Sequence, residues 1–310
     1  MKDKVLVSRN KKSLSVILKQ EGAFHIMMLL PFIFVLIYRY VPMTGIVLAF
    51  KTYRARLGIF GSPWVGMENF RILFDMPGFT DAIQNTLIIS IAKIILRIAI
   101  PVMFSLMLNE ITKSGLKRTI QTIVYLPHFI SWILMAGIII KILSQYGIVN
   151  KFLGGFGIEP IIFLAEKNRF PLILIVTDIW KEFGYASIVY LAAITGIDPN
   201  LYEAAEIDGA GRWKQTLHVT LPGMVPTIIL MSALALGGVL DAGFDQVFNL
   251  YSPIVYQTGD ILDTYIYRMA FQSAQFSLST AANLFKSAIG CVLIITSYRL
   301  AYKLSGYRIF

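Results

Sequence analysis

Six long apolar segments dominate this chain of 310 residues, and they limit what it can fold into more than any other feature. A helix that crosses the hydrocarbon core of a bilayer needs roughly 20 mostly apolar residues, and each segment is long enough. Backbone groups in lipid must be hydrogen-bonded within the segment, so we expect helices. The segments are residues 24–50, 82–109, 120–143, 170–195, 222–243 and 284–304. The sequence therefore predicts an all-α integral membrane protein with six membrane-spanning helices.

The composition supports a membrane protein over a soluble one. Hydrophobic residues make up 56% of the chain and charged residues only 15%, whereas soluble domains carry about 25% charged residues. The net charge of +10 would suit a nucleic-acid partner in a soluble protein, but the apolar segments argue against nucleic acid here. Cys291 is the one cysteine, so no intrachain disulfide forms, and the three scattered histidines have no metal-site spacing.

The distribution of basic residues predicts the orientation in the membrane. The termini and the even-numbered loops hold fourteen Lys and Arg residues, and the odd-numbered loops hold eight. Cytoplasmic loops carry the excess of positive charge, so both termini are expected in the cytoplasm. The first apolar segment resembles a secretory signal, but it is too long and lacks a clear cleavage site, so we expect it to be retained. The predicted parts are a cytoplasmic segment 1–22, a membrane domain 23–304 with a cytoplasmic loop 196–221, and a cytoplasmic tail 305–310.

The loop after the fourth segment carries a short helix in its sequence. Asp198 is a good N-cap, Pro199 suits the first helical position, and Gly209 suits the end of the helix. Ala204 and Ala205 keep one face small, so another protein can approach closely, while Glu203 and Asp208 supply charge at the rim. These residues are equally compatible with two interpretations, a helix that docks on another protein and an incidental helix in a polar loop.

The same loop resembles the cytoplasmic signature of permease subunits in binding-protein-dependent ABC importers. That signature is E-A-A, a glycine, and then I-x-L-P, and its positions here are Glu203, Ala204, Ala205, Gly209, Leu221 and Pro222, with Val219 in place of isoleucine. The resemblance implies the type I importer permease fold and a coupling helix that sits in a cleft of an ATPase subunit. It assigns docking to residues 203–205, with Asp208 beside them, and the helix-ending turn to Gly209.

Further segments resemble the carbohydrate branch of these permeases, the maltose-transporter type. Residues 64–70 (WVGMENF), 85–87 (NTL) and 207–210 (IDGA) look like its motifs. An aromatic residue common in the second half of the coupling loop is absent; Thr216 and Leu217 stand there. Three more segments resemble the subgroup that imports complex oligosaccharides, namely residues 40–53, 101–110 and 261–268.

The resemblance also implies the partners and the location. They are a second, different permease subunit, two ATPase subunits, and an extracellular solute-binding lipoprotein that delivers an oligosaccharide, all at a bacterial cell membrane. The chain has no phosphate-binding loop of the G-x-x-x-x-G-K-[ST] type, so ATP and Mg²⁺ are expected on the ATPase subunits. We expect no catalytic residue, cofactor or metal in this chain. Loops 51–81, 144–169 and 244–283 are expected outside, where they can receive the binding protein.

Ionisable residues inside membrane segments are costly and point to function. Lys93 and Arg97 lie four apart on one face of the second segment. The favoured interpretation pairs them with Asp178, Glu182 or a carboxylate of a partner permease, and the alternative is that they hold an acidic sugar such as a uronate. We also expect Lys181 to reach Asp178 and to point away from Glu182. The candidate substrate path consists of Lys93, Arg97, Trp180, Glu182, Tyr185 and Asp241, although membrane aromatics more often pack or anchor.

Three other functions remain in competition. A permease for another small solute is compatible with the coupling signature. An ion-coupled secondary transporter would suit the membrane charges, but paired inverted repeats are not evident and the signature would be unexplained. A membrane enzyme is disfavoured, because no nucleophile–base or metal constellation occurs in the sequence.

Overall fold

The computed structural model describes residues 14–305, and side chains from residue 22 to residue 299. Within this range the chain is helical, and its extended pairings are two isolated bridges, Lys51 with Trp64 and Arg54 with Gly58. The all-α prediction is therefore confirmed for the described chain. Residues 1–13 and 306–310, which belong to the two predicted cytoplasmic ends, lie outside it.

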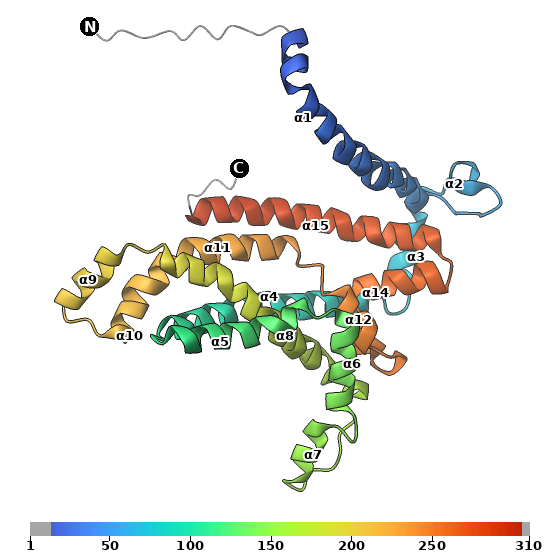
Figure 1. Cartoon of the computed structure of the whole chain (residues 1–310). Coiled ribbons are helices and arrows are strands. Elements are labelled where there is room, and N and C mark those ends of the chain that lie inside the picture. The colour runs from blue at the N-terminus through green and yellow to red at the C-terminus, as the bar shows by residue number, and fades with distance from the viewer. Residues whose placement is uncertain (1–13, 306–310) are drawn as a thin grey trace.

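The first part of the first span projects away from the rest of the molecule, whereas its last part, η2 (Val41–Phe50), packs on α15 (Phe276–Ser305). The span comprises α1 (Leu14–Val35), a π-helical turn η1 (Leu36–Tyr40) and the 3₁₀ segment η2. Figure 1 shows α1 directed away from the other helices, and its apolar residues are almost all exposed. A helix that is apolar on all sides lies against lipid or another protein rather than in water.

Four long helices form the body of the molecule (Figure 1). They are α4 (Phe79–Asn109), α8 (Phe170–Thr195), α11 (Leu221–Gly237) and α15 (Phe276–Ser305). Helix α4 packs along α8, and α11 packs along α15. Among the described residues, five helical stretches are long and apolar enough to cross a membrane: Gly22–Phe50, Phe79–Asn109, Trp132–Gly154, Arg212–Gly237 and Phe276–Arg299.

Helix α8 is the fourth of the six predicted spans, and it falls outside those five because of its charges. It has 26 residues, so at 1.5 Å per residue it is about 39 Å long and can cross a bilayer. Asp178, Lys181 and Glu182 lie near its middle. These three charged residues, rather than its length, set α8 apart, and their partners are described below.

The predicted third span is not one straight helix, and this part of the prediction is wrong. Helix α5 (Ser114–Tyr125) ends in a 3₁₀ turn, η3 (Leu126–Phe129), and α6 (Trp132–Leu143) begins after it in a new direction (Figure 1). Pro127 explains the break, because proline has no N–H for an α-helical hydrogen bond and its ring clashes with the preceding turn. Ser131 then caps α6 by accepting a hydrogen bond from the Leu134 amide at 3.4 Å.

One end of the body gathers the segments that were predicted to be cytoplasmic. Helix α9 (Pro199–Ile207), α10 (Arg212–Gln215), the start of α5 and the last turns of α15 all lie there (Figure 1). A π-helical turn, η5 (Thr216–Thr220), joins α10 to α11 without a break. The grouping at one end agrees with an even number of crossings between these segments.

The other end carries short helices from the segments that were predicted to be external. They are α2 (Gly58–Gly61), α3 (Glu68–Asp75), α7 (Ile148–Gly154), η4 (Phe163–Ala165), α12 (Phe244–Leu250), η6 (Pro253–Val255), α13 (Tyr256–Gly259), α14 (Leu262–Tyr267) and η7 (Arg268–Gln272). Asn85 and Thr86 hold the long segment between α11 and α15 in place. The Asn85 amide donates to the Asp260 carbonyl at 3.1 Å, and the Thr86 hydroxyl accepts from the Leu262 amide at 2.8 Å.

The WVGMENF segment has a structural role at the same end. The Asn69 side chain donates to the carbonyls of Ala49 and Lys51 at 2.8 and 3.0 Å, and the Trp64 ring stacks on Phe50 with centroids 5.6 Å apart. These contacts tie α3 to the end of the first span.

Candidate functional site

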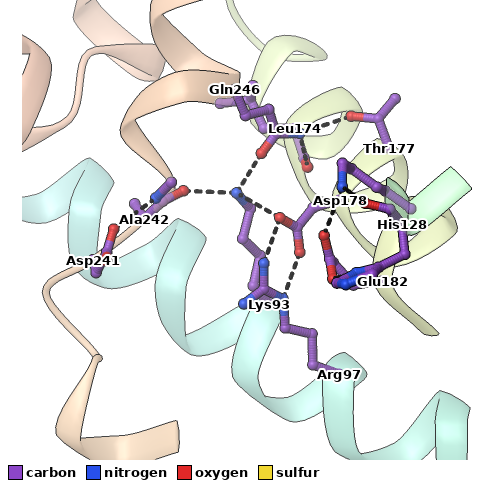
Figure 2. Close-up of polar contacts among 12 residues, drawn as sticks. Lys93, Arg97, His128, Leu174, Thr177, Asp178, Glu182, Asp241, Ala242 and Gln246 are labelled. Atoms are coloured by element: carbon purple, nitrogen blue, oxygen red, sulfur yellow. Dashed lines mark hydrogen bonds and ion pairs between the residues drawn. The ribbon is translucent and has the colours of Figure 1, made fainter. Parts of the chain in front are cut away.

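A buried carboxylate on α8 organises the charges inside the membrane body. Asp178 is 1% exposed and accepts two hydrogen bonds from Arg97 of α4, from Nε to Oδ2 and from Nη2 to Oδ1, both at 2.7 Å (Figure 2). The Lys93 ammonium lies 3.4 Å from Oδ1 of the same carboxylate. The favoured interpretation of Lys93 and Arg97 is thus confirmed, with Asp178 as their shared partner.

Lys93 is buried, and its contacts hold neighbouring elements together. It is 3% exposed, and its ammonium also donates to the Ala242 carbonyl at 2.6 Å and to the Gln246 Oε1 at 2.5 Å. The amide nitrogen of Gln246 in turn donates to the Leu174 carbonyl at 2.7 Å (Figure 2). The ammonium therefore joins α4 and α8 to the turn before α12. Buried charges persist when they are paired and hydrogen-bonded in this way.

A second polar cluster lies further along α8, at the helix break. The Lys181 ammonium donates to the His128 carbonyl at 2.7 Å and pairs with Glu182 Oε1 at 3.1 Å. The expected arrangement of Lys181, reaching Asp178 and pointing away from Glu182, is wrong. The long lysine side chain instead supplies a donor to a carbonyl that the break has freed, and such carbonyls inside a membrane need a partner.

His128 is a candidate site residue that the sequence analysis missed. Its Nδ1 lies 2.7 Å from Glu182 Oε2, and its ring stacks on Tyr185 with centroids 3.9 Å apart and planes 1° apart. The signal available in the sequence was a histidine directly after Pro127 inside an apolar run. Its partner stands 54 positions away, so only the fold brings the two together.

The remaining predicted path residues lie apart from these clusters. Trp180 is 42% exposed, and two residues of helical rotation put it on the far side of α8 from Asp178. Asp241 accepts from the Gly243 amide at 3.2 Å and lines a separate cavity of about 400 Å³ between α11 and α15, beside Lys286. In the described part of the chain, no group of three or more His, Cys, Asp or Glu side chains is placed to hold a metal ion.

The second candidate site is helix α9, whose ends form as expected. The Asp198 side chain accepts from the Asn200 amide at 3.0 Å, Pro199 is the first helical residue, and Gly209 adopts the left-handed conformation with φ of +72°. Glycine is favoured at such a position because it has no Cβ to clash. Leu201 and Ile207 are 53% and 87% exposed, so this short helix presents apolar side chains to its surroundings.

Two contacts fasten α9 and its connection from α8 to the base of α11. The Tyr202 hydroxyl lies 3.0 Å from the Thr220 hydroxyl. A Cβ built on Gly223 would lie 2.7 Å from the Ile197 side chain, so Gly223 lets the chain before α9 pack closely on α11. Leu221 and Pro222 lie between these two contacts, at the start of α11.

A helical membrane body, with paired charges inside it and an exposed short helix at one end, defines a membrane transport subunit. The chain belongs to the family of binding-protein-dependent transport system inner membrane components, whose family model matches residues 97–305. The family bears out the predicted permease fold.

Curated relatives and solved structures match almost the whole chain. The polygalacturonan/rhamnogalacturonan transport system permease protein YteP of Bacillus subtilis is 39% identical over 97% of this chain and 94% of its own length. Protein LplB of the same organism is 36% identical over 94% of this chain and 92% of its own. A chain from a bacterial ABC transporter involved in importing the acidic polysaccharide alginate is 38% identical, with a TM-score of 0.88 over 94% of this chain and 99% of that chain.

Proposed function

We propose that this chain is the membrane-spanning subunit of an ATP-driven importer that carries acidic oligosaccharides from a solute-binding protein into the cytoplasm. Similarity over nearly its full length supports this proposal, since two of the proteins named above belong to a polygalacturonan/rhamnogalacturonan transport system and to a transporter involved in the import of alginate. Both polygalacturonan and alginate are chains of uronates, so their oligosaccharides carry a carboxylate on each sugar.

The observation that carries the ATP-driven part is the apolar stripe on α9. Leu201, Ala204 and Ile207 are exposed and three residues apart, so they share one face of the helix. Glu203 and Asp208 are exposed beside them. An apolar stripe with a charged rim is suited to docking in a protein groove as an amphipathic helix. The partner we propose is an ATPase subunit, whose cleft would receive α9 and which would itself bind ATP and Mg²⁺.

The topology and the other partners belong to the same proposal. The excess of Lys and Arg in the termini and even loops supports cytoplasmic ends in a bacterial cell membrane, with α9 on the cytoplasmic side. A solved structure of the alginate transporter in complex with an alginate pentasaccharide-bound periplasmic protein, matched at 38% identity and a TM-score of 0.86, supports delivery by a binding protein. The exposed first span supports a second permease subunit as a packing partner, and we expect a heterodimer.

Substitutions in α9 test the ATP-driven part in proteoliposomes that contain the complete importer. Glu203→Arg reverses the charge at the docking rim, and Gly209→Pro forbids the positive φ that ends the helix. Both variants should insert in the membrane normally and abolish ATP-dependent uptake and ATPase co-purification. Lys113→Glu, a charge reversal at an exposed position just before α5, outside both α9 and the loops expected to receive the binding protein, should leave both intact. Undiminished uptake in both α9 variants would refute the coupling role.

A further inference from the structure

Some side chains of the two polar clusters on α8 are partly exposed, although they lie along the middle of a membrane-spanning helix. Side-chain exposure is 46% for Arg97, 30% for His128 and 22% for Glu182, and Tyr185 is 45% exposed. Ionisable groups in membrane helices face a protein partner or a water-filled cavity, because lipid would make them very costly. This side of α8 therefore faces the transport cavity or another subunit.

Arg97 is held in one orientation, and some of its N–H groups remain without a hydrogen-bond acceptor among the described residues. Its Nε and Nη2 bond both oxygens of Asp178, and its Nη1 has no hydrogen-bond partner among the described residues. A guanidinium has five N–H donors in a fixed plane, so a two-point attachment also fixes the direction of the remaining donors. Planar donors of this kind match the geometry of a carboxylate.

The charges in direct contact along α8 do not balance. Three cations face two carboxylates: Lys93, Arg97 and Lys181 against Asp178 and Glu182. Asp241 is exposed and lies beyond ion-pair distance, but its charge still acts on both Lys93 and Arg97. Charge interactions strengthen where the dielectric is low, so the half-exposed guanidinium of Arg97 attracts an anion on its exposed side.

Tyr185 supplies an apolar surface beside this cation. One face of its ring is covered by His128 and Phe129 lies at an angle to it at 6.0 Å, so the other face has no stacked ring among the described residues. The C–H face of a pyranose packs on an aromatic ring, whose face is electron-rich. Tyr185 lies seven residues along α8 from Asp178, about 10 Å on the same side of the helix, which is comparable to two linked sugar rings.

We propose that Arg97 and Tyr185 form a binding site for two linked units of an acidic oligosaccharide. Arg97 binds the carboxylate of one uronate, Tyr185 packs on the neighbouring ring, and the His128–Glu182 pair fixes the orientation of Tyr185. Asp178, anchored by Lys93, holds the guanidinium in place. The site rests on the proposed function and adds the residues that recognise the charge of the sugar.

The test compares uptake of oligogalacturonate and of its methyl ester, which differ in charge but not in backbone. Complete importers in proteoliposomes carry either wild-type permease or Arg97→Gln. We expect at least tenfold lower uptake of the acid by Arg97→Gln and less than threefold lower uptake of the ester. The ratio of the two rates on one preparation cancels any loss of folded complex. Arg118→Gln, at an exposed position on α5 outside the loops expected to receive the binding protein, removes the same charge and should leave the ratio unchanged.

Tyr185 variants test the other half of the site. Tyr185→Leu should lower uptake of acid and ester by similar factors of about tenfold, and Tyr185→Trp should retain most of both. Equal effects of Arg97→Gln on acid and ester, or none on either, would overturn the site while the proposed function stands. Wild-type importers that take up neutral oligosaccharides, but neither oligogalacturonate nor oligoalginate, would overturn the acidic substrate class and the site with it.

Discussion

Asp178→Asn should destabilise the protein strongly, because it removes the carboxylate that forms an ion pair with Lys93. Breaking a buried ion pair from one side costs about 3–5 kcal/mol, since the remaining charge stays buried without its partner. Lys93 would keep its hydrogen bonds to Ala242 and Gln246, and Arg97 is half exposed and can turn toward water. These remaining contacts place the loss at the lower end, about 3 kcal/mol.

Thermal unfolding of the purified importer in detergent measures this loss. At about 2 °C per kcal/mol for a chain of this size, Asp178→Asn should lower the apparent melting temperature by about 6 °C. The double variant Lys93→Met with Asp178→Leu removes both buried charges and should recover most of that loss, because apolar replacements of a buried pair are often neutral. Two results would refute the assignment of Asp178 as the counter-ion of Lys93. One is a melting temperature of Asp178→Asn equal to that of the wild type, and the other is a melting temperature of the double variant below that of Asp178→Asn.

Three further predictions address contacts elsewhere in the chain. Gly184→Ala puts a Cβ 2.2 Å from the Val124 carbonyl, so it should push α5 from α8 and cost about 1–3 kcal/mol, seen as a lower melting temperature. Asp198→Ala should weaken α9 by about 1 kcal/mol and lower uptake per ATP hydrolysed, whereas Asn at that position keeps the cap and should preserve it. Burial opposes the charge of Arg268, but its two hydrogen bonds to Asp260 raise the pKa of the guanidinium above its usual range. Lysine cannot make this two-point contact, so Arg268→Lys should lower the free energy of unfolding by about 2 kcal/mol. The loss should appear as faster hydrogen exchange in residues 253–272.

The sequence predicted the features that depend on local pattern. Apolar length located the first two spans and the last three, and the cap chemistry of Asp198 and Pro199 located the start of α9. Pairing of Lys93 or Arg97 with a carboxylate was also predicted, with Asp178 as one of the candidates beside Glu182 and a partner's carboxylate, because a buried cation needs a counter-ion. In each case a short stretch of sequence, or the cost of an unpaired charge, specifies the outcome.

The break in the third span could not be placed from composition. Residues 120–143 are apolar throughout, and membrane helices tolerate proline when other groups satisfy the freed carbonyls. Whether Pro127 bends or interrupts the helix depends on Lys181, which reaches the His128 carbonyl from another helix. The site at His128 was missed for the same reason, since it exists only once α8 packs against the break.

The attachment of α9 has a mechanical consequence for the whole subunit. Residues 212–237 form one continuous helical segment of 26 residues with the π-helical turn η5 inside it, and Thr220 near its lower end contacts Tyr202 of α9. Its upper end leads into the turn whose Ala242 carbonyl binds the Lys93 ammonium. Helix α9 and Arg97 are therefore joined by one continuous route of contacts, which runs through this helical segment, the turn after it, Lys93 and Asp178, so a docking protein that moves α9 would pull on the same chain of contacts.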